Sequence, residues 1–357
     1  MNTKKRSINW PDVERVLVVR LRSIGDTVLS TPSLFALRRF LPNARIDVLL
    51  EDWVAPVLEG SDVVDEVIPI GKGSLSRLRT ALELRRNKYD VVFNLHGGTT
   101  STFLTRFTGA RHRVGYKNYQ YSSLYTELLL SSSDFWGEDK THSAEQQLAL
   151  LGFVGVPVSD RPKSLLKASP EAAEEIRTLL HVYGIDEDKL VLLHPSTAFV
   201  TKQWTPENYA RIAEYFAAMR IARVAVATPT EAETLARVVG SSRVSIFPFD
   251  NLSLQQITAL AARAEIFVGN DSGIAHIAAA VGTPTVVIFG SSNRDHWRPW
   301  TDAPNEIVFE KFDCQPCPGY RCEVYGHPKC IESVSTESVI AAIDRVRKKA
   351  STRDGRG

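Results

Sequence analysis

A short polar turn in the second half of the chain has the residue types of an anion-binding site. An apolar run at 266–268 predicts a buried strand, and an Ala-rich helix carrying His276 is predicted after the turn Asp271, Ser272, Gly273. The first amides of such a helix lack partners within it and lie at the positive end of its dipole, so they can bind an anion. A simple helix cap, with His276 packed in the core, is the alternative.

A second polar turn follows another predicted buried strand, at 190–193. It contains Ser196 and Thr197, then Lys202 and Trp204, and a helix is predicted directly afterwards. Open α/β sheets bind their ligands at the carboxyl edge of the strands. A lone lysine in a loop is usually a solvated charge. Here the lysine lies beside a second turn that could also bind an anion, and one diphosphate bound by both turns is the better explanation.

Both turns lie within longer motifs that are typical of one enzyme family. The chain resembles glycosyltransferase family 9, the ADP-heptose:lipopolysaccharide heptosyltransferases, over about residues 13–345. Four motifs in order carry the resemblance: VLVVRLRSIGDTVLSTPSLFALRRFLPNARIDVL at 16–49, GARHRVGY at 109–116, HPSTA with TKQW at 194–204, and VGNDSGIAHIAAAVGTPTVVIFG at 268–290.

Strand-like apolar runs alternate with helical periods along the chain, which predicts an α/β fold with parallel sheets. The resemblance implies the GT-B fold, in which two Rossmann-like parallel-sheet domains face each other across a cleft. With 357 residues, of which 43% are hydrophobic, the chain is long enough for two cores. The expected strands are 16–21, 46–50, 67–70, 91–95, 190–193, 224–228, 245–247, 266–268 and 285–289.

A segment with three prolines, 156–170, is expected to link the domains. It separates an acceptor-binding domain at 1–165 from a nucleotide-sugar domain with a cysteine-rich tail at 166–335. A final helix and tail at 336–357 are expected to pack back on the first domain. No apolar run approaches the ~18 residues of a membrane span, and no apolar segment follows the basic start. We therefore expect a cytoplasmic protein, peripheral on the inner face of the cytoplasmic membrane.

The turn after the first predicted strand has Gly25 and a carboxylate, Asp26, where dinucleotide-binding folds have three glycines. This argues against a nicotinamide-dependent oxidoreductase. The resemblance implies that Asp26 is the general base of an inverting glycosyl transfer and takes the proton of the acceptor hydroxyl. Ser23, Gly25 and Thr27 are assigned to the acceptor side. Helix capping by Asp26 is the alternative.

The resemblance assigns the sugar-nucleotide donor to the second half of the chain. Lys202 is expected to contact the phosphates, and Glu231 the ribose or base, although Ala227 and Thr228 replace two glycines of the family's turn. A lysine and a helix terminus can stabilise a diphosphate without a divalent ion, so no cofactor is expected for catalysis. The donor site is expected to contain Ser196, Thr197, Lys202, Trp204, Glu231, Asp271, Ser272, Gly273 and His276.

A local excess of positive charge predicts an anionic partner. Residues 72–117 contain ten Lys or Arg and only two acidic residues, although an ordinary solvated helix face is the alternative. No nucleic-acid motif accompanies them, so a phosphorylated glycolipid is the better partner. Arg111 and Arg113, in an expected turn, and His96, by resemblance, are assigned to the acceptor.

All four cysteines, Cys314, Cys317, Cys322 and Cys330, lie in one short segment. In a reducing compartment such a cluster favours a metal over disulfides, and the opening C-x-x-C suits a structural zinc or iron. Four free thiols in an ordered loop are the alternative.

The sequence therefore predicts an inverting glycosyltransferase that moves a heptose from ADP-heptose to the inner core of lipopolysaccharide, with lipid A–Kdo or a heptosyl group as the acceptor. The alternatives are transfer of another sugar, transfer to a protein, or binding of a sugar nucleotide without turnover. The acceptor, the linkage position and the oligomeric state are left open.

Overall fold

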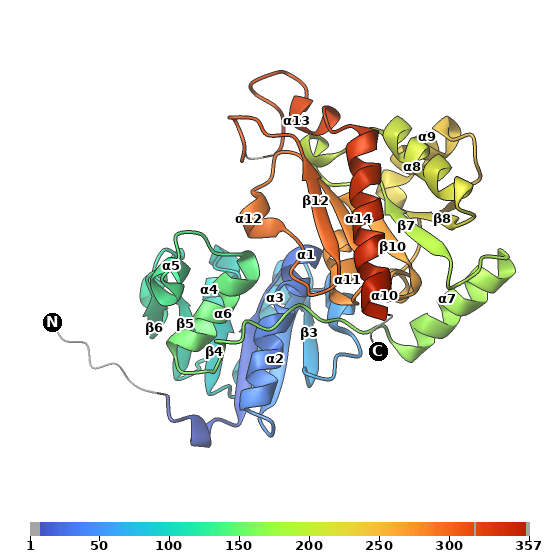
Figure 1. The fold of residues 1–357 in the computed structure, drawn as a ribbon. Helices are drawn as coiled ribbons and strands as arrows, with labels where there is room; N and C mark the ends of the chain where they lie inside the picture. Colours follow the sequence, from blue (N-terminus) through green and yellow to red (C-terminus); the bar gives the residue numbers. More distant parts are fainter. Residues whose placement is uncertain (1–7, 318, 355–357) are drawn as a thin grey trace. The chain divides into compact units, whose positions relative to one another are not determined.

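The computed structural model describes residues 8–317 and 319–354. The chain divides into two compact units, Met1–Ser164 and Leu165–Gly357, each of which contains one six-stranded sheet (Figure 1). The division falls within the proline-containing segment 156–170, between the last helix of the first unit and the first helix of the second.

The first unit is a parallel sheet with the strand order β3-β2-β1-β4-β5-β6. Its strands are β1 (Arg15–Val19), β2 (Arg45–Glu51), β3 (Glu66–Ile70), β4 (Val91–Asn94), β5 (His112–Tyr116) and β6 (Glu127–Leu129). Its α-helices are α1 (Ile24–Val28), α2 (Thr31–Phe40), α3 (Ser74–Arg86), α4 (Thr99–Phe107), α5 (Ser132–Trp136) and α6 (Ser143–Phe153), with short 3₁₀ turns η1 (Trp10–Asp12), η2 (Ala55–Leu58) and η3 (Ser122–Leu124).

The second unit repeats this topology with the order β12-β11-β10-β7-β8-β9. Its strands are β7 (Leu190–His194), β8 (Ala222–Val226), β9 (Phe247–Phe249), β10 (Ile266–Asn270), β11 (Thr285–Phe289) and β12 (Asn305–Phe309). Its helices are α7 (Pro170–Val182), α8 (Pro206–Ala218), α9 (Ala232–Ser241), α10 (Leu254–Arg263), α11 (Gly273–Ala280), α12 (Arg294–Trp297), α13 (Lys329–Glu332) and α14 (Thr336–Asp354), with 3₁₀ turns η4 (Val200–Lys202) and η5 (Pro229–Glu231).

Each sheet has one point where the strand order reverses, between β1 and β4 in the first unit and between β7 and β10 in the second. At such a point the connections leave toward opposite sides, so the carboxyl ends of the two central strands border a crevice. The turns that contain Asp26, His96, Lys202 and Ser272 each follow one of these four strands, whereas the motif at 109–116 is mostly β5 and the Glu231 turn follows β8. The predicted Rossmann-like parallel sheets are therefore confirmed, and the fold is of the GT-B kind.

Three strands were not expected from the sequence. β5 contains His112 and Arg113 and so lacks an apolar run, β6 has only three residues, and β12 begins with the polar residues Asn305 and Glu306. The segment containing Arg111 and Arg113 was expected to be a turn, but residues 112–116 are β5. Buried central strands such as β1 were recognised because both of their faces are covered.

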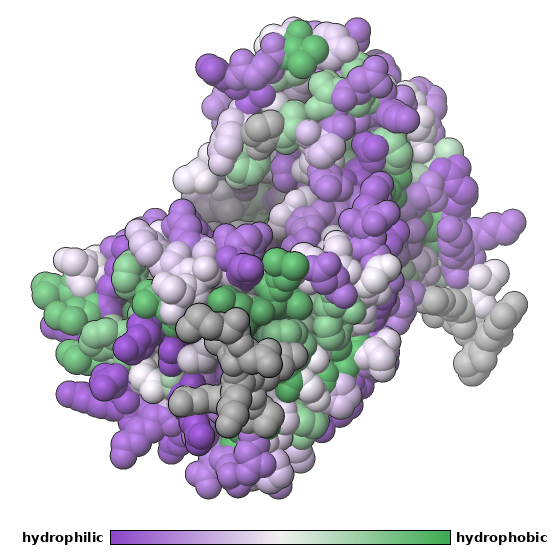
Figure 2. Space-filling view, turned by 90° about the vertical axis from the view of Figure 1, so that its left-hand side faces the viewer, coloured by the Kyte–Doolittle hydropathy of each residue, from purple (hydrophilic) through white to green (hydrophobic). Residues whose placement is uncertain are grey.

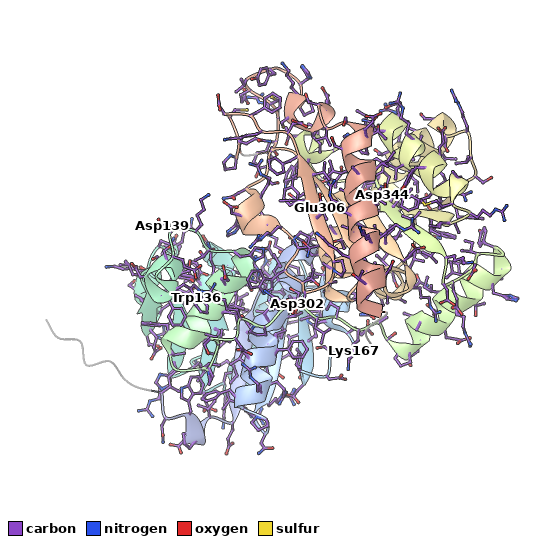
Figure 3. The ribbon with its side chains drawn as sticks, in the orientation of Figure 1. Trp136, Asp139, Lys167, Asp302, Glu306 and Asp344 are labelled. Carbon is purple, nitrogen blue, oxygen red and sulfur yellow. The ribbon has the colours of Figure 1, made fainter. Side chains whose placement is uncertain are left out.

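The last helix, α14, belongs to the second unit. Its buried residues Val339, Ala342, Ile343 and Val346 are part of that unit's core. Glu306 of β12 accepts a hydrogen bond from Arg345, and Asp344 accepts one from Tyr215 of α8 (Figure 3). These contacts fix α14 on the second unit, and its packing on the first domain stays a prediction. The buried residues of α14 form an apolar stripe, and this stripe packs in the core of the sheet that precedes the helix in the chain.

No helix among the described residues is both long and apolar enough to cross a bilayer.

Candidate functional site

Asp26 lies in the turn after β1 and is held at both carboxylate oxygens. One oxygen pairs with the guanidinium of Arg20, and Oδ2 accepts hydrogen bonds from Ser23 Oγ at 3.0 Å and Ser23 N at 3.3 Å. The bond to Ser23 N is half of a capping box at the start of α1. Asp26 is thus the N3 residue of a capping box whose N-cap is Ser23, and it is also an oriented carboxylate at the carboxyl edge of the sheet.

The turn after β4 is joined to the Asp26 turn through Arg20, whose Nη1 donates to the Leu95 carbonyl at 2.7 Å. Asn94, fully buried at the end of β4, shapes this second turn because its Oδ1 accepts from the amides of His96 at 2.9 Å and Gly97 at 3.0 Å. Burial, and then the nearby guanidinium of Arg20, lower the pKa of His96 to about 4, so its imidazole is neutral near pH 7.

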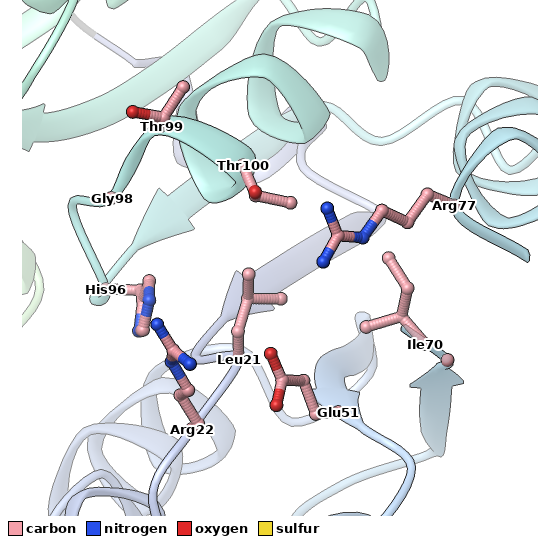
Figure 4. Close-up of a pocket in the computed structure, with 10 residues that line it drawn as sticks. Leu21, Arg22, Glu51, Ile70, Arg77, His96, Gly98, Thr99 and Thr100 are labelled. Carbon is pink, nitrogen blue, oxygen red and sulfur yellow. The ribbon is translucent and has the colours of Figure 1, made fainter. Parts of the chain in front are cut away.

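A pocket of about 280 Å³ opens at the carboxyl ends of β1 to β4. Arg22, Glu51, Arg77 and His96 approach one common space in it (Figure 4). The described residues that line the pocket are Leu21, Arg22, Glu51, Ile70, Gly71, Arg77, His96, Gly98, Thr99 and Thr100. The pocket offers two cations, one carboxylate and hydroxyl groups, which are suitable partners for an anionic polyhydroxylated ligand.

Four residues that the sequence analysis assigned to the acceptor do not line this pocket. Thr27 is fully buried and Gly25 is buried, so both shape the turn and offer no side chain to a ligand. The Arg113 guanidinium donates to the carbonyls of Ala110 at 2.5 Å and Leu124 at 2.8 Å, and burial lowers its pKa. Arg113 is therefore a structural residue of β5. Arg111 is exposed, and neither arginine lines the pocket.

In the second unit, Asn270 joins the two predicted anion-binding turns. Its Nδ2 donates to the Pro195 carbonyl at 2.8 Å, and its Oδ1 accepts from the Trp204 amide at 3.1 Å. Ser272, directly after β10, caps α11 by accepting from the Ala275 amide at 3.4 Å. The turn after β7 and the amino end of α11 therefore form one constellation at the point where the strand order reverses.

Lys202 is directed at this constellation. Its Nζ lies 2.9 Å from Oδ2 of Asp271, a carboxylate that is only 5% exposed and also accepts from Ser292 Oγ. The position of Lys202 depends on a close approach of two backbones, because a Cβ on Gly290 would lie 2.2 Å from the Thr201 carbonyl oxygen. Asp271 and Ser292 thus hold the cation in place.

His194 is the last residue of β7 and contacts Ser272, the N-cap residue of α11. Its Nδ1 is 3.1 Å from Ser272 Oγ. Burial lowers the pKa of His194 to about 4, so its imidazole is also neutral near pH 7. A neutral imidazole can orient the Ser272 hydroxyl without adding charge to the anion site.

Three residues expected at the donor site are buried. Trp204 is 0% exposed and donates through Nε1 to the Val334 carbonyl at 2.9 Å, so it belongs to the core. Ser196 is also fully buried, although its hydroxyl has no hydrogen-bond partner among the described residues. His276 is also buried, on α11.

Thr197 and Glu231 remain partly accessible near these turns. The carboxylate of Glu231 accepts from the amide of Thr228 at 3.0 Å and from its hydroxyl at 2.8 Å in a capping box.

The sequence model of glycosyltransferase family 9 (heptosyltransferase) matches residues 77–326, which is most of the chain. The chain belongs to this family. Lipopolysaccharide heptosyltransferase 3 of Escherichia coli K12 is 27% identical over 340 residues, covering 91% of this chain and 96% of the relative.

Two solved structures of this family share the fold. The glycosyl transferase family 9 protein from Veillonella parvula has a TM-score of 0.81 and 22% identity, covering 94% of this chain and 97% of that one. E. coli heptosyltransferase WaaC with ADP-2-deoxy-2-fluoro heptose has a TM-score of 0.67 and 19% identity, covering 93% and 99%.

The cysteine segment of this family 9 member packs beside the Lys202 turn. The Cys317 amide donates to the Ser291 carbonyl at 3.0 Å, and Thr201 Oγ1 donates to the Gly319 carbonyl. All four thiols are free. Burial raises the pKa of Cys330, and the neighbouring Cys317 and Cys314 thiols raise it further.

Cys314, Cys317 and Cys322 line one pocket of about 290 Å³. As placed, the side chains of the described residues include no group of three or more His, Cys, Asp or Glu that could hold a metal ion. The iron-containing dodecameric glycosyltransferase TibC of E. coli is a more distant structural relative, with a TM-score of 0.56 and 14% identity, covering 95% of this chain and 77% of that one.

The sequence alone gave no site role to four residues that organise the site: Asn94, His194, Asn270 and Ser292. Most of them stand within or beside the motifs at strand ends, so a signal was present. Their roles depend on contacts between turns that are far apart in the chain, which spacing along one segment does not reveal.

Proposed function

We propose that this family 9 enzyme is an inverting heptosyltransferase that moves a heptose from ADP-heptose to the inner core of lipopolysaccharide. The observation that carries the proposal is the constellation in the second unit, where Lys202 and the amino end of α11 meet at the reversal of strand order. The WaaC structure contains a fluorinated ADP-heptose, and the curated relative is a lipopolysaccharide heptosyltransferase, which support this choice of substrates.

The donor diphosphate would bind Lys202 and the first amides of α11. An ammonium group has three N–H donors, and Asp271 accepts only one of them in the structure, so two are available to phosphate oxygens. The charge of Asp271 is paired with that of Lys202, and Ser292 donates a hydrogen bond to the same carboxylate, which reduces its repulsion of the ligand. The negative charge on the leaving ADP grows as the glycosidic bond breaks, and these donors stabilise it.

The acceptor would bind the first unit. In the transfer, an acceptor oxygen forms a bond to the anomeric carbon of the heptose, while the bond from that carbon to the β-phosphate oxygen breaks and ADP leaves. Asp26 would take the proton of the acceptor hydroxyl. Arg20 and Ser23 orient its carboxylate, so the base is positioned before the substrate arrives.

The pocket beside Asp26 supports an anionic sugar acceptor. Arg22 and Arg77 would bind a phosphate or carboxylate, and Glu51 and Thr100 would bind sugar hydroxyls. We therefore propose residues 1–165 as the acceptor-binding domain and 166–335 as the donor-binding domain, with lipid A–Kdo or a heptosylated core as acceptor. Such an acceptor is membrane-anchored, so the protein would act as a peripheral protein at the cytoplasmic face of the membrane.

We also propose that the four cysteines can close around one structural zinc or iron ion, because three of them line one pocket and the fourth, Cys330, is their neighbour. This ion would order the segment that packs on the Lys202 turn and would have no part in the reaction.

The proposal is tested by incubating the purified protein with ADP-heptose and a panel of truncated core oligosaccharides. ADP release together with a product heavier by one heptose is expected with an inner-core acceptor. ADP binding without release would indicate a binding protein, and transfer only from another ADP-sugar or only to a protein would replace the proposed substrates.

A further inference from the structure

Helix α3 presents leucines to solvent. Leu75, Leu78 and Leu82 are spaced three and four residues apart, so they lie on one face of the helix, and they are 71%, 53% and 43% exposed. The opposite face buries Ala81 and Leu84. A surface helix normally directs its apolar stripe only toward the core, so this outer row needs an explanation of its own.

Helix α4 adds two aromatic residues to the same surface. Phe103 and Phe107 are 51% and 41% exposed. Both helices cover the same side of the first sheet, because Ala81 and Leu84 of α3 and Leu104 of α4 belong to one core cluster. They are also joined where Arg85 approaches the Phe107 carbonyl.

We call the outer surface of these two helices the α3–α4 face. It consists of Leu75, Leu78, Arg79, Leu82, Arg86, Phe103, Arg106 and Phe107. The space-filling view shows hydrophobic side chains reaching the molecular surface in groups among hydrophilic ones (Figure 2).

Within the described part of the chain, the arginines of this face have no acidic partners. Arg79, Arg86 and Arg106 are exposed, and none of them forms an ion pair with another described residue. Glu83 is the one carboxylate within α3, and Asp90 is occupied by the amides of Glu14 and Arg15 at 2.9 Å. The face is therefore apolar and positively charged at once.

We propose that the α3–α4 face binds the surface of an anionic phospholipid bilayer. Its leucines and phenylalanines would enter the boundary between head groups and acyl chains, and its arginines would bind lipid phosphates. Unpaired arginines interspersed with exposed apolar residues match an anionic lipid surface. They would repel each other across a contact between two copies of this chain.

The position of α3 relates this surface to the acceptor. Arg77, on the same helix, lines the pocket at the carboxyl ends of the strands. The inference builds on the proposed glycolipid acceptor, since a lipid-anchored substrate whose head group enters that pocket has its acyl chains in the bilayer that α3 would contact.

Vesicle sedimentation without either substrate tests the surface. Phosphatidylcholine vesicles with and without phosphatidylglycerol are mixed with the full-length protein at low and high salt. We expect binding only to the anionic vesicles and weaker binding at high salt, because screening removes the electrostatic part. Absence of binding to anionic vesicles at low salt would overturn the proposal.

Two triple variants test the two chemical components. Leu75→Gln/Leu78→Gln/Leu82→Gln removes apolar area, and Arg79→Gln/Arg86→Gln/Arg106→Gln removes charge, each with an expected loss of roughly tenfold or more in vesicle affinity. Val182→Gln and Arg177→Gln, exposed on α7, are matched controls that should bind as the parent does. Unchanged affinity in both triple variants would refute the assignment to this face.

The same variants separate this inference from the proposed function. Transfer to a soluble, delipidated acceptor should be unchanged in both triple variants, whereas transfer to acceptor embedded in vesicles should fall with vesicle affinity. If the parent protein fails to transfer heptose to any acceptor, the proposed function fails while the vesicle result stands. A change of oligomeric state in the leucine variant, with no vesicle binding by the parent, would show that the face joins copies of the chain.

Discussion

The Nζ of Lys202 lies 2.9 Å from Oδ2 of Asp271, although the two residues belong to different turns 69 positions apart. The cation proposed for the donor is therefore already the partner of a nearly buried carboxylate. This pairing gives Lys202 two separable roles, one in folding and one in ligand binding.

Lys202→Ala should lower both stability and affinity for ADP. It leaves the nearly buried Asp271 without its cation, which costs about 3–5 kcal/mol of stability, and it removes a charged donor to phosphate, which costs about 1.5–3 kcal/mol of binding energy. The double variant Lys202→Ala/Asp271→Asn should recover much of the melting temperature and none of the ADP affinity. Calorimetric titration with ADP and thermal melting measure the two effects. Normal ADP affinity in the single variant would leave Lys202 with a structural role alone.

Asp26→Asn should reduce turnover by ~10²-fold or more, as expected for a lost general base. The amide can still accept the capping hydrogen bond from Ser23, so the fold should be retained. ADP affinity should also be unchanged, because Asp26 is in the other unit. The measurements are single-turnover kinetics and ADP titration. Near-normal turnover would remove Asp26 from the role of base.

Arg111 and Arg113 should respond differently to charge reversal. Arg113→Glu would place a carboxylate against the carbonyls of Ala110 and Leu124, so a lower melting temperature is expected. Arg111→Glu, at an exposed position, should leave melting unchanged and raise the KM for an anionic acceptor with little effect on ADP-heptose. An effect of Arg111→Glu on the donor alone would contradict our assignment of the acceptor to the first unit.

Stability should fall as the pH is lowered from about 6.5 to 4. His194 and His96 have pKa values lowered from 6.5 to about 4, so the unfolded chain binds more protons in this window and is favoured by acid. Above pH 6.5 both imidazoles are neutral in either state, and the effect vanishes. His194→Asn should make the decline of the unfolding free energy less steep. The contribution of His194 to this decline is at most roughly 3 kcal/mol. Denaturant unfolding at several pH values provides the test, and an unaltered slope in the variant would contradict it.

The cysteine proposal predicts about one zinc or iron per chain in anaerobically purified protein. Chelation should lower the melting temperature, since the ion would be a main source of order in that segment. It should also weaken ADP binding, because Gly319 accepts from Thr201 beside Lys202. Cys314→Ser should reproduce both effects. Active, fully folded protein with neither metal in stoichiometric amount would leave the cysteines as free thiols.

Local sequence was sufficient to predict both Rossmann-like sheets and the turns that follow β1, β4, β7 and β10. Buried parallel strands are continuous apolar runs, and a polar turn before a helix start is a short-range pattern, so both can be recognised without a structure. β6 and β12 could not be predicted in this way, because β6 has only three residues and β12 begins with the polar residues Asn305 and Glu306.

Side-chain direction was decided only by the tertiary structure. Trp204 and Thr27 stand in motifs beside Lys202 and Asp26, yet packing turns them into the core, whereas Lys202 and Asp26 meet Asp271 and Arg20 at strand ends. The exposed leucines of α3 are a second case in which the sequence could not predict the direction of the side chains. A helical period shows that residues share a face, but the packing of α3 on its sheet determines which face is buried.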